Sequence, residues 1–213
     1  MPRFSIVIPT HDRGENGPVW MKELLDSLKI QTFQDFDIVV SDQSKNDKIL
    51  DTCKEYSEDF DFTYIRYDGE VPCENINIGL RECTGQIVKI MFSDDVFVDS
   101  NALQIINDTY TSTNCKWAFS GFCGTRDGKN LYDNRTPRWT EHTLEGRNLL
   151  SSPSVVSFLN ECKVEFDENL KLLLDVDFYH RIRMNHGHPH IIPEVLVANR
   201  DHDDRISSNA TSN

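Results

Sequence analysis

The sequence is poor in positive charge and lacks the long apolar runs of membrane proteins. Its 213 residues contain 22 Lys and Arg against 35 Asp and Glu, which gives a formal net charge of −13. A chain this acidic is a poor partner for nucleic acid or for an anionic membrane surface. No apolar run approaches the ~20 residues that a membrane-spanning helix needs. We therefore expect no nucleic-acid partner and no integral membrane segment.

The cysteines and glycines of the sequence do not form the patterns that indicate zinc or phosphate binding. No two of the six cysteines form a Cys-x-x-Cys pair, so neither a zinc knuckle nor a dense disulfide framework is predicted. Gly14 and Gly17, with Arg13 as a single basic neighbour, do not form a glycine-rich phosphate loop. The N-terminal residues lead directly into an apolar strand without a secretory signal. We therefore expect reduced thiols and a cytoplasmic protein.

What the sequence does contain is a regular alternation of strand and helix patterns, in a chain long enough for one domain. Apolar, β-branched runs predict strands at 4–9, 37–41, 62–66, 87–92, 117–122 and 191–197. Apolar residues at helical spacing predict helices at 18–30, 46–56, 76–83, 101–111 and 175–184. The alternation predicts an α/β fold with a parallel sheet. The polar segment 124–147 lacks any such period, and we expect it to be a functional loop or disordered.

The strand at 87–92 is followed by two adjacent carboxylates, Asp94 and Asp95. No basic residue flanks them in the sequence, and crowding two anions is costly unless they are paired or ligated. Asp99 and Ser100 are available to cap the next helix, so capping does not account for the pair. Mg²⁺ or Mn²⁺, bound together with the phosphates of a substrate, satisfies such a pair on an open α/β sheet. The strand end therefore predicts a metal site, with a helix cap as the alternative.

Four segments carry a family resemblance. They are IVIPTHDR at 6–13, SLKIQTFQDFDIVVSD at 27–42, NIGL at 77–80 followed by Gly85 and the acidic strand end, and FDENL with LDVDFYHR at 166–181. In this order they resemble the family 2 glycosyltransferases of the GT-A fold. The resemblance implies a single GT-A-type, Rossmann-like domain at 1–205, with a mostly parallel central sheet flanked by helices. It implies a nucleotide-sugar-binding half at about 1–98, an acceptor-binding half at about 99–205, and a flexible tail at 206–213.

The resemblance also places a metal motif at the acidic strand end. The usual motif of the family is Asp-x-Asp, but here Phe92 takes the place of the first Asp and Asp94 falls on the second. That second carboxylate is the one that the resemblance assigns to the metal. Asp94, with Asp95 beside it, is therefore implied to bind Mn²⁺ or Mg²⁺. His202 resembles the C-terminal histidine that closes the metal site in some relatives, and a plain surface histidine is the alternative.

The resemblance places the catalytic base at Asp175. In an inverting displacement a positioned carboxylate must take the proton of the acceptor hydroxyl. Asp177 is the rival, and an N-cap role is the alternative for Asp175. Asp42 is suited to accept the N–H of a uracil ring, and guanidinium groups suit a diphosphate. The predicted donor-binding residues are Thr10, His11, Arg13, Asp42, Asn77, Arg81 and Asp94; structural roles are the alternatives for Asp42, Asn77 and Arg81.

These expectations together imply a metal-dependent, inverting glycosyltransferase of the hexosyltransferase type. Its donor is expected to be a nucleotide sugar, UDP-linked by preference, and its acceptor a glycan or another hydroxyl compound, as in polysaccharide biosynthesis. Phe92 favours one alternative, a GT-A-like domain that binds sugar nucleotides or glycans after losing turnover. A sugar-phosphate nucleotidyltransferase is a further alternative, but it needs the phosphate loop that residues 13–17 do not form.

Overall fold

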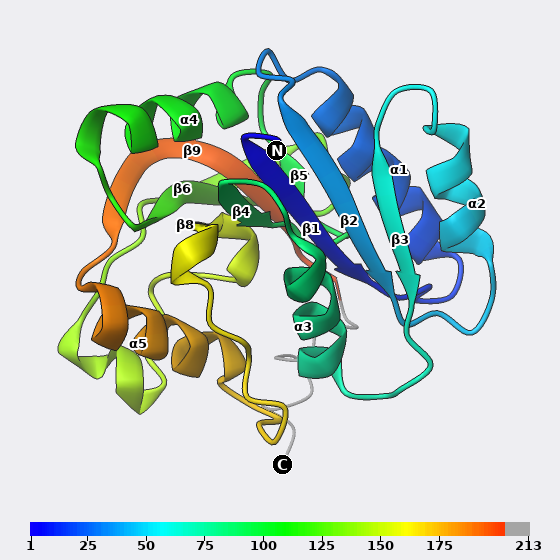
Figure 1. Ribbon diagram of the computed structural model, residues 1–213. Coiled ribbons are helices and arrows are strands. Elements are labelled where there is room, and N and C mark those ends of the chain that lie inside the picture. Colours follow the sequence, from blue (N-terminus) through cyan, green and yellow to red (C-terminus); the bar gives the residue numbers. More distant parts are fainter. Residues whose placement is uncertain (203–213) are drawn as a thin grey trace.

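The computed structural model describes residues 1–202, and the first half of this chain alternates strands and helices (Figure 1). Its elements are β1 (Phe4–Thr10), α1 (Asn16–Lys29), β2 (Phe36–Asp42), α2 (Lys48–Glu55), β3 (Phe62–Arg66), α3 (Pro72–Glu82) and β4 (Ile87–Ile90). Strand β1 pairs in parallel with β2 and β4, and β2 pairs in parallel with β3. Every residue of β1 and β4 is buried, because helices cover both faces of these central strands.

The second half extends the same sheet with mixed pairing. Its elements are β5 (Val96–Phe97), α4 (Ala102–Thr113), β6 (Trp117–Thr125), β7 (Leu131–Arg135), β8 (Val156–Leu159), α5 (Leu174–His186) and β9 (His190–Arg200), with short 3₁₀ turns η1 (Glu141–Glu145), η2 (Pro153–Val155) and η3 (Asn160–Cys162). The strand order is β3-β2-β1-β4-β8-β6-β9-β5, and β7 pairs with β6. Strand β8 is antiparallel to both of its neighbours, whereas β6 and β9 are parallel.

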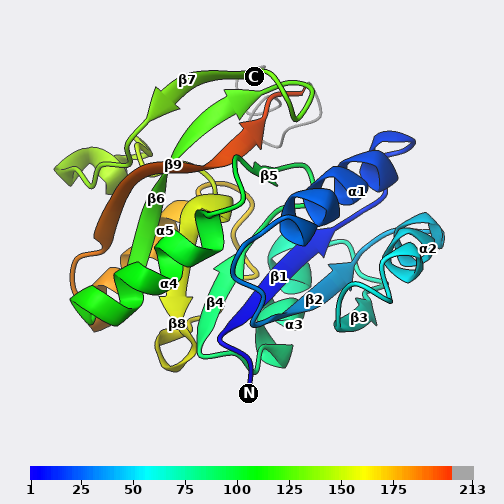
Figure 2. The same cartoon turned by 90° about the horizontal axis from the view of Figure 1, so that it is seen from above.

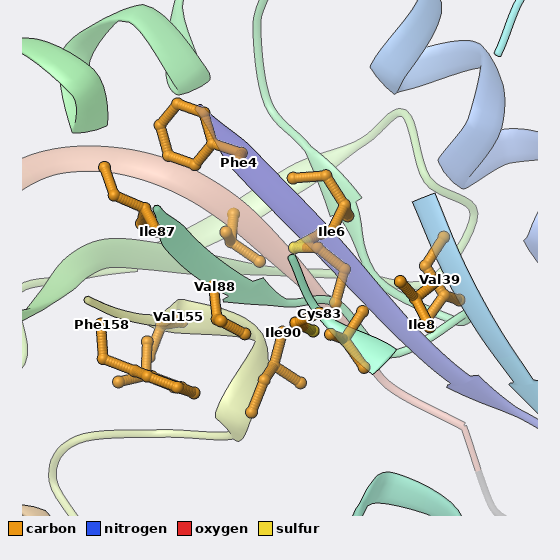
Figure 3. Packing of buried hydrophobic residues seen from close by; sticks show 14 of the residues in the cluster. Phe4, Ile6, Ile8, Val39, Cys83, Ile87, Val88, Ile90, Val155 and Phe158 are labelled. Carbon is orange, nitrogen blue, oxygen red and sulfur yellow. The ribbon is translucent and has the colours of Figure 1, made fainter. Parts of the chain in front are cut away.

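Helices form a layer on each side of this sheet. Helices α1 and α4 lie over one face and α3 and α5 over the other, as the two views show (Figure 1, Figure 2). Between these layers the apolar side chains of β1 and β4 pack with those of β8, including Ile6, Ile90 and Phe158 (Figure 3). The predicted α/β domain, with a mostly parallel central sheet flanked by helices, is confirmed.

The predicted strands and helices correspond to observed elements, but one segment was predicted wrongly. Within 124–147, residues Leu131–Arg135 form the strand β7, which pairs with β6 in a hairpin. All five residues of β7 are exposed, so this strand has no buried apolar face that a sequence pattern would reveal. Strands β5 and β8 were not predicted, since they are only two and four residues long. The predicted tail at 206–213 lies outside the described residues.

The order of the strands creates a natural binding position beside β1. From β1 the chain moves outward through β2 and β3, and then returns to place β4 on the opposite side of β1. Ligands bind beyond the carboxyl ends of the strands at such a reversal. The two strand ends lie close together: the hydroxyl of Thr10, the last residue of β1, donates to the Ser93 hydroxyl after β4 at 2.8 Å. The acidic pair therefore follows one of the two strands that frame this position.

Helix α3 packs closely against β1 and β2 at Gly79. A Cβ atom at Gly79 would lie 2.8 Å from Val7 Cγ1 and 3.0 Å from the Ser41 hydroxyl. Glycine is therefore needed here for the close approach of the helix to β1 and β2. The approach brings Asn75, one turn earlier, within hydrogen-bond distance of the Thr10 carbonyl, at 3.2 Å.

Two further expectations can be compared with the described chain. Within residues 1–202 no helix combines the length and apolar character needed to cross a bilayer. All six cysteines are free, as expected from their spacing.

Candidate active site

A cleft of about 1260 Å³ opens where the carboxyl ends of β1 and β4 meet. The first half of the chain contributes Thr10, His11 and Asp94 to its lining, and the second half contributes Asn148 and Asp175. The cleft therefore brings together carboxylates that are far apart in the sequence. Its volume exceeds that of a typical small-molecule site, which leaves room for two substrates side by side.

Asp94, which lines the cleft, is hydrogen-bonded to His202. The Nε2 atom of His202 lies 2.9 Å from Asp94 Oδ2, and both side chains are largely buried. Burial alone would raise the pKa of Asp94, but the hydrogen bond with His202 and the charge of Arg13 outweigh it, so the pKa lies below its ordinary value. Trp20 of α1 packs on the His202 ring at 4.7 Å between centroids, which fixes the ring beside the carboxylate.

Asp95 has a different environment from its neighbour. Its side chain is 3% exposed, and Oδ1 accepts the backbone N–H of Arg200 at 2.9 Å. The Arg200 guanidinium, itself buried, donates to the Asp94 carbonyl at 2.8 Å and pairs with Glu23 of α1. Asp95 and Arg200 thus tie the end of β9 to the turn after β4. Because the end of β9 is held there, His202, two residues beyond Arg200, lies beside Asp94.

The residues around Asp94 fit a divalent metal ion that also binds a diphosphate. Within residues 1–202, no three His, Cys, Asp or Glu side chains converge on a point that would hold a metal by themselves. Mg²⁺ and Mn²⁺ commonly take only one or two protein ligands and complete their coordination with substrate phosphates and water. Asp94 Oδ2 and His202 Nε2 lie 2.9 Å apart, joined by a hydrogen bond, and an ion bound by both atoms would replace the proton between them.

Asp175 lies at the start of α5 and is the second carboxylate of the cleft. Its Oδ1 accepts the N–H of Val176 at 2.9 Å, and its Oδ2 accepts the side-chain amide of Asn148 at 2.5 Å. Burial raises the pKa of Asp175, although these hydrogen bonds oppose the shift. A carboxylate with a raised pKa is a stronger base. Its rival Asp177 does not line the cleft and instead forms an ion pair with Arg181 at 2.6 Å.

Besides Asp94, three of the predicted donor-binding residues belong to the cleft lining, namely Thr10, His11 and Arg13. Burial, with a smaller contribution from the charge of Arg13, lowers the pKa of His11 and so favours its neutral form at pH 7. Phe92, which stands where the family motif has its first Asp, also lines the cleft and donates its backbone N–H to the Ser154 hydroxyl at 2.9 Å.

Strained backbone is concentrated around the same cleft. Five non-glycine residues of the described chain have positive φ, and three of them, Arg13, Ser151 and Leu173, line the cleft. Such conformations are costly for residues with a Cβ and tend to occur at functional sites.

Three predicted donor residues lie outside the cleft lining. Asp42 is fully buried, and its carboxylate accepts the Ser44 N–H at 2.8 Å and the Tyr64 hydroxyl. Asn77 is fully buried as well; it accepts the Phe166 N–H at 2.7 Å and donates to the Phe166 carbonyl at 2.9 Å. Arg81 pairs with Glu165 through two hydrogen bonds, of 2.8 and 2.6 Å. In this structure the three side chains therefore bond to other parts of the chain, and their donor-binding role stays a prediction.

Several polar residues of the cleft were not predicted from the sequence. They are Gln43, Asn75, Ser93, Asn148, Ser151, Ser152, Lys171 and Asn199. The oxygen of the Asn75 amide and that of Asn199 are buried without a hydrogen-bond partner in the described part of the chain. Gln43 and Asn75 adjoin segments that carried the resemblance, so position offered a signal there. Asn148 and Ser151 follow a segment without periodicity, where the sequence gave no signal.

The family model for glycosyl transferase family 2 matches residues 5–160, which include both strands that frame the cleft and the acidic pair. This chain belongs to glycosyl transferase family 2. It shares 28% identity over 117 residues with a GalNAc(5)-diNAcBac-PP-undecaprenol beta-1,3-glucosyltransferase of Campylobacter jejuni, covering 52% of this chain and 36% of the relative. An uncharacterized glycosyltransferase of Rickettsia felis is 27% identical over 95 residues, covering 45% of this chain and 15% of the relative. The chain thus spans a minor part of these relatives.

Solved structures of GT-A-type glycosyltransferases share the fold. TarS 1-349 of S. aureus in complex with UDP-GlcNAc superposes with a TM-score of 0.77 at 19% identity, over 97% of this chain and 61% of that one. The mannosyltransferase PcManGT of Pyrobaculum calidifontis, in complex with GDP-Man and Mn²⁺, superposes with a TM-score of 0.69 at 16% identity, over 95% of this chain and 58% of that one. The GT-A fold that the sequence segments implied is therefore confirmed.

Proposed function

We propose that this family 2 member is a metal-dependent, inverting glycosyltransferase that transfers a hexose from a UDP-sugar to a hydroxyl group of a glycan or a similar acceptor. The observation that carries the proposal is the meeting of Asp94 and Asp175 in one cleft, with His202 at 2.9 Å from Asp94. One carboxylate is placed to interact with a leaving diphosphate, and the other to accept a proton. These are the two tasks of such a transfer.

The donor is proposed to bind in the half of the cleft formed by residues 1–98. Thr10 and His11, which line the cleft, are proposed to contact the nucleoside, and the positive charge of Arg13 suits the diphosphate. Asp94 and His202 would hold Mn²⁺ or Mg²⁺, with Asp95 fixing the end of β9 beside them. When bound, this ion supplies positive charge that neutralises the departing diphosphate. A neutral His11 adds no positive charge that would repel the ion.

The acceptor is proposed to bind in the half formed by residues 99–205. Asp175 takes the proton of the acceptor hydroxyl as its oxygen attacks the anomeric carbon of the donor. The amide of Asn148 holds one oxygen of the Asp175 carboxylate and so fixes the direction of the other. The UDP-sugar preference is supported by a structural neighbour in complex with UDP-GlcNAc, whereas another is in complex with GDP-Man. A donor panel therefore has to include both nucleotides.

The proposal is tested by nucleotide release. Purified protein with Mn²⁺ is incubated with UDP-glucose, UDP-GlcNAc or GDP-mannose, with and without sugar acceptors, and released nucleoside diphosphate is measured. Asp175→Asn is expected to lower turnover about 10³-fold while leaving UDP affinity nearly intact. Asp177→Asn, on the same helix but outside the cleft lining, is the matched control and should retain activity within about 3-fold.

Calorimetry separates metal dependence from turnover. Mn²⁺ is expected to strengthen UDP binding to the wild type, and Asp94→Asn should abolish that gain. Equal UDP affinity with and without Mn²⁺ in the wild type would refute the metal role. Binding without turnover of any donor would instead support a domain that has lost catalysis, as Phe92 suggests, and pyrophosphate release from a nucleoside triphosphate would support nucleotidyl transfer.

A further inference from the structure

Two exposed leucines line the cleft immediately before the proposed base. Leu172 and Leu173 are 57% and 51% exposed, and Asp175 follows two residues later. Leu149, which is 50% exposed, follows Asn148, whose amide binds the Asp175 carboxylate. Of these three leucines, Leu172 and Leu173 belong to the cleft lining, just before Asp175. Scattered exposed leucines need no explanation, but leucines gathered at the rim of a cleft indicate a ligand with an apolar part.

The backbone conformation of Leu173 is unfavourable for a leucine side chain. Leu173 is the N-cap of α5 and has φ +56°, in the left-handed region that favours glycine and asparagine. Its side chain makes no capping hydrogen bond, whereas Asn at this position would both tolerate the conformation and be able to cap the helix. Only about half of the Leu173 surface is buried in the free protein, so packing offsets only part of this cost. Stability of the fold therefore does not account for leucine here.

We infer that Leu172 and Leu173 form an acceptor subsite for a sugar or other hydroxyl compound that carries an apolar aglycone, such as an alkyl chain. This inference rests on the proposed function, because it takes Asp175 as the base and extends the acceptor half of the cleft outward. The subsite is continuous with the cleft at Asp175, so an acceptor hydroxyl at the carboxylate places its aglycone against the leucines. The cost of leucine in the left-handed region is then offset when the acceptor binds.

Alkyl glycosides test the inference directly. Binding of methyl and octyl β-glucoside is measured by calorimetry in the presence of UDP and Mn²⁺, with the octyl compound below its micelle concentration. The wild type is expected to bind the octyl compound at least about 10-fold more tightly than the methyl compound, since each buried methylene contributes several-fold in affinity. In Leu173→Asn and in Leu172→Asn the ratio should fall to about 2.

Thermal stability distinguishes a binding role from a structural one. Leu173→Asn should raise the melting temperature, by about 2 to 8 °C, because it relieves the left-handed leucine and adds a helix cap. Loss of the octyl preference together with a higher melting temperature supports the subsite. Leu131→Asn, at a leucine 46% exposed on β7 outside the cleft lining, is the matched control and should change neither property.

Three results would overturn the inference. They are an unchanged octyl-to-methyl ratio in the variants, a lower melting temperature for Leu173→Asn, or a wild-type dimer in sedimentation that Leu173→Asn dissociates, which would make the leucines a contact between copies. Nucleotide release from the donor panel is scored separately. Donor turnover without any octyl preference would reject the subsite and leave the proposed function standing, and absence of turnover would reject the function itself.

Discussion

Lys89 provides a quantitative test of how this core is built. It lies in the middle of β4 and is 0% exposed, with Nζ donating to the carbonyls of Ser154, Ile90 and Val156. Burial lowers its pKa from the ordinary 10.5 to about 7, and the nearby charge of Asp95 opposes part of that shift. At neutral pH the folded chain therefore holds fewer protons at Lys89 than the unfolded chain.

The sign and size of the pH effect follow from this difference. The pKa is lowered on folding, so stability rises with pH between about 7 and 10.5, where the unfolded chain binds the extra proton. From pH 7.0 to 8.5 the contribution of Lys89 to the free energy of unfolding grows by about 1.5 to 2 kcal/mol. For a domain of this size that corresponds to about 3 to 8 °C in melting temperature.

The assay compares the wild type with Lys89→Met at several pH values. Urea unfolding of both proteins is measured from pH 7.0 to 8.5, and the difference between them isolates Lys89 from other titrating groups. The wild type is expected to gain about 1.5 to 2 kcal/mol relative to Lys89→Met across this range. A constant difference would show that Lys89 stays charged in the folded state. The reasoning about its burial would then be wrong.

Three further substitutions test individual contacts by urea unfolding. Arg200→Met should lower the free energy of unfolding by about 3 to 5 kcal/mol, because it leaves Glu23 and the Asp94 carbonyl without the Arg200 donor. A loss below about 1 kcal/mol, or no recovery of stability in the double variant Glu23→Gln/Arg200→Met, would refute the role of Arg200 in holding the end of β9 to the turn after β4. Asn77→Ala should cost about 2 to 4 kcal/mol, since both backbone groups of Phe166 lose their partner, and a neutral result would contradict this. Gly79→Ala should cost about 1 to 3 kcal/mol through its clash with Val7, whereas stabilisation would show that α3 can move outward.

Much of the fold was predictable because its signals are local. The buried strands β1, β2 and β4 are apolar, β-branched runs, and the helices between them repeat apolar residues at helical spacing. Strand β7 was missed. All of its residues are exposed, so it has no apolar period, and it is a strand only because its backbone pairs with β6. Phe92 was visible in the sequence as a departure from the family motif, but its place in the cleft lining was not.

The sequence by itself determined the β-α alternation and the acidic end after β4, since both depend on neighbouring residues and their spacing, whereas Asp175 was a candidate base only through the family resemblance. Only the tertiary structure decided which polar groups meet. It brought His202, which the resemblance had implied at the metal site, to 2.9 Å from Asp94, and it gave Asn77 and Arg81 contacts outside the cleft lining. The physical reason is that apolar burial follows short-range periodicity, whereas a hydrogen bond or ion pair requires two specific groups, often far apart in the chain, to arrive within about 3 Å of each other.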